Sequence, residues 1–187
     1  MAKTTLNSAL QSIRGRIDDW VYRKFGDRMV ISRRPEFHGP LSAAQLAVRE
    51  RFREAAAYAK AALADPVRQP LYQAAARAKG LSLFAFVMGD FLNPPEVKAI
   101  DATGYHGRVG DPIKVTASDD FEVASVNVVI RTAANAVLEQ GPAALANGRW
   151  SYATTVPVAA GATVTIEATA QDRPGHPGSL SVSWLIA

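Results

Sequence analysis

Three aspartates in the C-terminal half are the residues best suited to metal chemistry. Asp119 and Asp120 follow one β-prone run, and Asp172 follows another, four residues before His176. In a two-sheet fold with this strand order the two loops fall at the same pole, where carboxylate oxygens would suit Ca²⁺. Aspartate also caps turns through its own backbone. The spacing of a dedicated calcium loop is missing, so no metal site is favoured and these aspartates stay weak calcium candidates.

No residue pattern predicts catalysis or a bound cofactor. His38, His106 and His176 do not stand at metal-ligand spacing from one another. The chain lacks a Gly-x-Ser-x-Gly turn, a Gly-rich phosphate loop and any cysteine. Asp18-Asp19 and Asp119-Asp120 are adjacent pairs whose side chains point apart, which makes them poor acid–base couples. We therefore expect no enzyme activity and no cofactor.

Cations and aromatic residues are interleaved in the first forty residues. The runs Trp20–Phe25 and 29–34 favour strands, and Gly26-Asp27-Arg28 between them predicts a hairpin loop. A two-stranded hairpin is marginal in water, so its apolar side chains need a cover. The predicted assembly residues are Trp20, Tyr22, Phe25, Met29 and Ile31. The candidates for contact with an anionic partner are Arg14, Arg16, Arg23, Lys24, Arg28, Arg33 and Arg34.

The source of that cover stays open between another subunit, the rest of the chain and nucleic acid. Single-stranded nucleic-acid binders combine aromatic platforms with surrounding cations, as this arm does. Lys and Arg outnumber Asp and Glu by 15 to 9 over residues 1–97, whereas the count is 6 to 8 over residues 98–187. This asymmetry predicts an acidic partner: nucleic acid, an anionic surface or the acidic face of a neighbouring subunit.

Three helices are predicted between residues 42 and 93. Ser42 and Gln45 fit a capping box, and apolar residues at helical spacing follow for about six turns. Asp65-Pro66 predicts the start of a second helix, and Gly80 its C-terminal cap. Ser82 is expected to cap the third helix, which is apolar on almost every face and is therefore expected to be the buried centre of this half.

From residue 97 onward the apolar residues alternate with a period of two, which indicates half-buried strands. About seven strands at this spacing favour a β-sandwich. They are expected over residues 97–103, 113–117, 126–130, 137–141, 150–156, 164–170 and 180–186.

Four segments carry a resemblance to a known family. Gly110-Asp111-Pro112, residues 117–120, residues 148–152 and residues 168–175 resemble the repeating units of bacterial immunoglobulin-like (Ig-like) domains. The resemblance covers about residues 97–187 and implies a binding, spacing or decorating module rather than a catalyst. The helical half, through residues 61–66 and 78–80, resembles an uncharacterised bacterial protein family, which supplies no activity to transfer.

Together these observations predict an α+β multidomain chain. Its parts are an extended arm with a β-hairpin (residues 1–40), a three-helix module (41–95) and an Ig-like β-sandwich (96–187). The predicted function is non-catalytic: self-association or docking on a larger assembly through the arm and helices, with the Ig-like module displayed. The alternatives are nucleic-acid binding by the arm, and carbohydrate or surface-protein binding by the sandwich.

The same sequence predicts where the protein works. No run reaches the roughly 18 apolar residues of a membrane span, and residues 1–8 lack the apolar core of a secretory signal. We expect a cytoplasmic protein, free or built into a particle or filament, and a homo-oligomer or member of a larger protein assembly as its working state.

Overall fold

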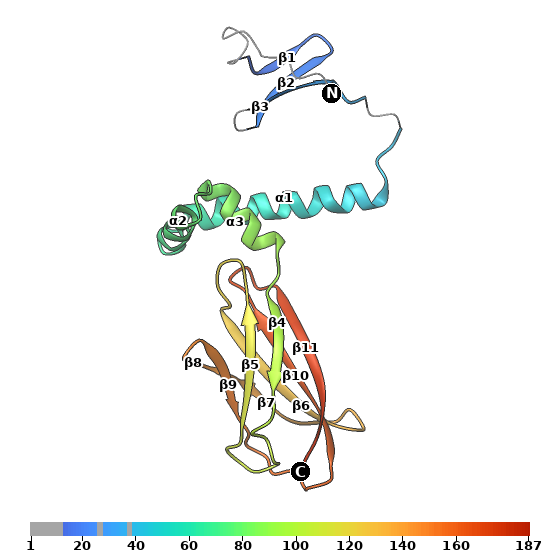
Figure 1. Cartoon of the computed structure of the whole chain (residues 1–187), viewed down its shortest axis with the longest axis vertical. Coiled ribbons are helices and arrows are strands. Elements are labelled where there is room, and N and C mark those ends of the chain that lie inside the picture. The colour runs from blue at the N-terminus through green and yellow to red at the C-terminus, as the bar shows by residue number, and fades with distance from the viewer. Residues whose placement is uncertain (1–12, 26–27, 37–38) are drawn as a thin grey trace. The chain divides into compact units, whose positions relative to one another are not determined.

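The computed structural model describes residues 13–25, 28–36 and 39–187. These residues form three helices and three antiparallel sheets, a mixed α+β structure that includes a β-sandwich (Figure 1). The chain divides into two compact units, Met1–Ser42 and Ala43–Ala187. The first unit contains the arm sheet, and the second contains the helices and the sandwich.

The arm sheet has three strands, not the two of the predicted hairpin. Its order is β1 (Gly15–Ile17), β2 (Trp20–Phe25) and β3 (Arg28–Arg33). The additional strand β1 forms because Asp18 adopts a positive φ of 51°, which short Asx side chains tolerate, and the chain reverses over two residues. Three strands with an apolar face are closer to independent stability than a lone hairpin.

The three helices lie where the sequence predicts them. They are α1 (Ala43–Ala64), α2 (Arg68–Ala78) and α3 (Leu83–Leu92). Helix α2 begins later than expected because Asp65 closes a turn first, its Oδ1 accepting from the Val67 amide at 2.8 Å. None of the described helices is both long and apolar enough to cross a bilayer.

The expected C-terminal cap of α2 and the expected N-cap of α3 are confirmed, whereas Asp65 is not the N-cap of α2. Gly80 has a φ of 65°, and the Leu81 amide donates to the Ala76 carbonyl at 3.0 Å, the long hydrogen bond of a Schellman motif. The Ser82 side chain accepts from the Ala85 amide at 3.3 Å. Glycine suits position 80 because a positive φ is strained for other residues.

Helix α3 is buried on one face only, which corrects the expectation of a helix covered all round. Phe86, Val87 and Asp90 are buried, whereas Phe84 is 39% exposed. Its buried residues face α1, α2 and the sandwich loops, and Ala85 on the other side is exposed as well. The apolar composition of α3 therefore predicted more burial than the structure shows. Composition alone does not determine how many elements pack against a helix.

The sandwich has eight strands in two antiparallel sheets (Figure 1). One sheet has the order β11-β10-β6-β7 and the other β4-β5-β9-β8. Only β8 was not expected, because its three residues are alanine and leucine and give little strand signal. The bounds are β4 Glu96–Asp101, β5 Pro112–Ser118, β6 Ser125–Thr132, β7 Val137–Pro142, β8 Ala144–Ala146, β9 Arg149–Ala153, β10 Thr163–Gln171 and β11 Pro177–Leu185.

The core of the sandwich consists of the inward side chains of both sheets. Ile113, Val115, Val128, Ile130 and Ile166 are fully buried. Their burial follows from the period of two, because alternate residues of a strand face the opposite sheet.

Loops of the sandwich pack against the helices within the second unit. The Phe121 ring lies 4.7 Å from the Tyr72 ring and 5.5 Å from the Phe86 ring, measured between centroids. The Phe91 ring meets the His176 ring edge-on at 4.6 Å. Aromatic contacts of this geometry stabilise beyond their buried area. The helical core thus includes a residue of the β5–β6 loop.

Candidate functional site

The register of the arm sheet gathers aromatic and aliphatic residues on one face. Trp20 pairs with Ile17 and Arg33, Tyr22 pairs with Ile31, and Lys24 pairs with Met29. Directly opposite residues of antiparallel strands share a face, as do alternate residues along one strand. We call this side the apolar face; its members are Ile17, Trp20, Tyr22, Met29 and Ile31, with Lys24 and Arg33 beside them.

The apolar face is open over much of its area. Ile17 is 55% exposed, Trp20 44% and Ile31 47%, while Tyr22 and Met29 are half-buried. The Arg33 guanidinium lies 5.7 Å from the centre of the Trp20 ring, which is within the range of a cation–π interaction. A contiguous exposed patch of this composition is typical of an interaction surface.

The opposite side of the sheet is the cationic face. It carries Arg16, Arg23 and Arg28 together with Val21, Val30 and Ser32. The Arg16 Nε donates to the Asp18 carbonyl at 3.0 Å. Cations and aromatics that alternate in sequence therefore separate onto two faces, with Lys24 and Arg33 as the exceptions.

Two of the remaining predicted arm residues, Arg14 and Arg34, lie outside both faces, whereas Phe25 pairs with Arg28. Arg14 precedes β1, and Arg34 follows β3, where its backbone amide donates to the Asp19 carbonyl at 2.7 Å. Phe25 is the last residue of β2, and its side chain is outside the described part of the chain. The structure thus brings together four of the five predicted assembly residues.

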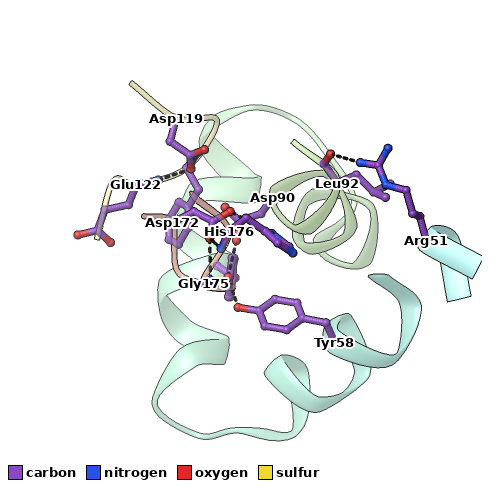
Figure 2. Close-up of polar contacts among 11 residues, drawn as sticks. Arg51, Tyr58, Asp90, Leu92, Asp119, Glu122, Asp172, Gly175 and His176 are labelled. Atoms are coloured by element: carbon purple, nitrogen blue, oxygen red, sulfur yellow. Dashed lines mark hydrogen bonds and ion pairs between the residues drawn. The ribbon is translucent and has the colours of Figure 1, made fainter. Parts of the chain in front are cut away.

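In two of the three calcium candidates, Asp119 and Asp172, one carboxylate oxygen accepts hydrogen bonds from backbone amides. The Asp119 Oδ2 accepts from the Phe121 and Glu122 amides, both at 3.0 Å. The Asp172 Oδ1 accepts from the Gly175 and His176 amides at 2.7 and 2.6 Å (Figure 2). Each carboxylate thereby closes its own turn.

Asp120 serves a different contact. Its Oδ2 accepts from the Asn93 side-chain amide at 2.6 Å, and its backbone carbonyl accepts from the Lys79 ammonium. Across residues 13–25, 28–36 and 39–187, no group of three or more His, Cys, Asp or Glu side chains is arranged to hold a metal ion. His38 lies outside these residues, and the His106 backbone amide donates to Asp111.

Sequence reasoning missed a buried polar junction among the three helices. Asp90 of α3 is 1% exposed, and its Oδ2 accepts from the Tyr72 hydroxyl at 2.6 Å. The Tyr58 hydroxyl lies 3.0 Å from that of Tyr72, so one chain of hydrogen bonds joins all three helices (Figure 2). No spacing rule finds such a contact, because the partners come from three elements.

Burial and nearby charges shift the pKa values of Asp90 and Tyr72 in this junction. Desolvation, with the nearby Asp119 and Asp172 carboxylates, raises the pKa of Asp90 to about 6, although the Tyr72 hydrogen bond acts against this. Burial and the hydrogen bond to Asp90 raise the pKa of Tyr72, so its phenol stays protonated and donates. Asp90 Oδ1 and Asp119 Oδ1 are buried without a hydrogen-bond partner among the described residues.

A second buried carboxylate lies inside the sandwich. The Glu139 Oε2 accepts from the Tyr152 hydroxyl at 3.0 Å and from the Thr155 amide and hydroxyl, both at 2.6 Å. These bonds tie β7 to β9 and the segment after it. Glu139 is 7% exposed and Asp90 is 1% exposed. Asp90 also lines a pocket of about 280 Å³ together with Lys79, Asn93 and Asp120.

Comparisons with known proteins give the following. No family model and no curated protein matches this chain. Among solved structures, CopC from Methylosinus trichosporium OB3b is 10% identical, with 49% of this chain and 91% of that chain covered and a TM-score of 0.37. The bromide derivative of BhCBM56 is 15% identical, with 43% and 85% covered and a TM-score of 0.32.

A third solved structure is a conjugative transposon lipoprotein from Bacteroides eggerthii DSM 20697. It is 10% identical, with 48% of this chain and 93% of that chain covered, and the TM-score is 0.26. All three scores lie below 0.5, so the assignment of a β-sandwich rests on the two sheets of this chain themselves.

Proposed function

We propose that this protein is a non-catalytic assembly protein that docks on a neighbouring copy or a larger assembly through the apolar face of its arm. One observation carries the proposal: Ile17, Trp20 and Ile31 share one sheet face and are each about half exposed. Covering them would remove apolar surface from water and so stabilise association. Tyr and Trp are also enriched at the centres of protein interfaces.

The sandwich is the displayed module in this proposal, and we infer that it is Ig-like. Strand order supports the inference: β4-β5-β9-β8 and β11-β10-β6-β7 correspond to the A-B-E-D and G-F-C-C′ order of Ig sandwiches. An Ig-like module suits spacing or surface presentation, and the arm supplies attachment. The division at residues 40 and 95 belongs to the same proposal.

Sedimentation velocity of two matched double variants tests the docking face. Trp20→Thr with Ile31→Thr removes apolar surface from the apolar face, and Val21→Thr with Val30→Thr does so on the cationic face. Threonine keeps the strand preference in both. We expect the first variant to lose association and the second to retain it. Wild type that stays monomeric at every concentration would contradict the proposal.

A second candidate function, nucleic-acid binding, is favoured by the cationic face. Arg16, Arg23 and Arg28 share this face, one on each strand at successive diagonal positions, where they would meet a phosphate backbone together. Labelled single- and double-stranded DNA should then bind at low salt and dissociate steeply as salt rises. Replacing the three arginines with glutamine should abolish binding, and no binding at low salt would remove this candidate.

A further inference from the structure

Helix α1 carries an apolar stripe that continues past its packing partner. Val48, Phe52, Ala55, Ala59 and Ala62 recur at alternating steps of four and three, which places them along one side of the helix. The three alanines are fully buried, whereas Val48 is 53% and Phe52 52% exposed. The stripe is therefore covered over its C-terminal half and open over its N-terminal half.

The N-terminal half of this stripe is open because α3, which packs against α1, ends at Leu92. The Arg51 guanidinium donates to the carbonyl of Leu92, the last residue of α3, at 3.1 Å (Figure 2). Beyond this point Val48, Arg51 and Phe52 line a groove of about 220 Å³ with Leu92 and Asn93. We call it the α1 groove.

A second groove adjoins the first through Arg51 and Leu92. It measures about 250 Å³ and reaches Glu54, Phe91 and the sandwich residue His176. The Glu54 carboxylate forms no ion pair with any described residue. The linings of the two grooves thus combine apolar side chains with one basic group, Arg51, and one acidic group, Glu54.

The charges of the two units indicate which surface fits the α1 groove and the groove beside it. Residues 1–42 contain 8 Lys and Arg against 4 Asp and Glu, whereas residues 43–187 contain 13 of each. Two arms facing one another would bring Lys24 and Arg33 of each copy together, and like charges across an interface oppose association. The second unit has no net charge to oppose a basic arm. Arg51, which lines both grooves, already donates to the Leu92 carbonyl, and Glu54 beside it offers the cations of an arm a partner.

The geometry points to the α1 groove as the receptor for the arm sheet of a second copy, with the apolar face laid over Val48 and Phe52. This inference rests on the proposed function and names its partner surface. Each copy then has one donor arm and one acceptor groove, so the contact is heterologous. Repetition of such a contact closes into a ring or extends into a filament.

Complementation between two full-length variants tests the pairing. A donor-defective chain carries Trp20→Thr and Ile31→Thr, and an acceptor-defective chain carries Val48→Gln and Phe52→Gln. Each should be monomeric alone, with self-association roughly 30-fold or more weaker than wild type. An equal mixture should form a dimer, because one intact arm meets one intact groove. Leu46→Gln, about 200° around α1 from Val48, is the control and should associate like wild type.

The possible outcomes separate this inference from the proposed function. Both exposed acceptor positions tolerate glutamine in a helix, so an unchanged thermal unfolding curve should accompany the loss. If only the donor-defective chain fails to associate, the arm docks elsewhere and the α1 groove is wrong. If both fail and the mixture stays monomeric, the pairing is also wrong. A monomeric wild type would overturn the pairing and the assembly function together.

Discussion

At the scale of single residues, the stability of the second unit depends on how Asp90 is held. Its carboxyl group is buried among helices, receives one hydrogen bond from Tyr72, and has Asp119 and Asp172 as nearby like charges. An ionised group in such a place is costly unless it is fully paired. The folded protein therefore favours the protonated form of Asp90 more strongly than the unfolded chain does.

This burial predicts a pH-dependent stability. Asp90 has a folded pKa of about 6 against an ordinary value of 3.8, so the folded protein holds this proton more tightly than the unfolded chain. The contribution is fully present below about pH 4 and is lost as pH rises through 6, a change of about 3 kcal/mol. Urea unfolding between pH 4 and 7 measures it. Asp90→Asn should flatten the profile, and an equally steep profile in this variant would show that another group is responsible.

Tyr72 gives a second test at this scale. Tyr72→Phe removes the hydroxyl that donates to Asp90 and leaves a buried carboxylate oxygen without its partner. We expect a loss of about 1–3 kcal/mol in the free energy of unfolding at pH 7. Tyr58→Phe is the matched control, because Tyr58 reaches Asp90 only through Tyr72 and should cost less. Equal losses for the two variants would contradict the assigned order of the hydrogen bonds.

At the scale of elements, close backbone approach fixes where β11 meets the end of the helical segment. A Cβ added at Gly178 would lie 1.7 Å from the Pro95 carbonyl oxygen. Only glycine fits at position 178 without moving β11 or the segment that contains Pro95.

Gly178→Ala should therefore destabilise the protein. The added methyl group must push β11 away from Pro95, and overpacking of this kind costs about 1–3 kcal/mol. Gly89→Ala is the control: its Cβ meets nothing within 4 Å, and alanine in a helix should stabilise by about 0.5–1 kcal/mol. Thermal unfolding of both variants reads out the difference. A neutral Gly178→Ala would mean that the join is looser than this contact implies.

Elements were more predictable than contacts. Alternation and capping residues place all three helices and seven of the eight strands of the sandwich, because those signals are local. Strand β1 was missed because Gly15-Arg16-Ile17 is too short to show alternation, and it exists only through pairing with β2. The Asp90–Tyr72 bond was missed for the same reason, since it depends on the tertiary packing of two helices.

The two faces of the arm fall between these cases. The sequence shows aromatics and cations interleaved, and the period of two already implies that alternate residues part. Only the register adds that Tyr22 lies opposite Ile31 and Trp20 opposite Arg33. A shift of the β2–β3 register by one residue would have placed every side chain of β3 on the other face.

At the scale of the whole molecule, we expect association between copies to bury the apolar face of the arm. The chain contains no cysteine, so a single introduced thiol reports on one position. Met29 lies on the apolar face and Ser32 on the cationic face of the same strand, and both are half-buried. Met29→Cys and Ser32→Cys therefore form a matched pair.

The most direct measurement is the rate at which a maleimide labels each thiol as the protein concentration rises. We expect labelling at position 29 to slow as copies associate, while labelling at position 32 keeps its rate. Equal rates at both positions over the whole concentration range would contradict it.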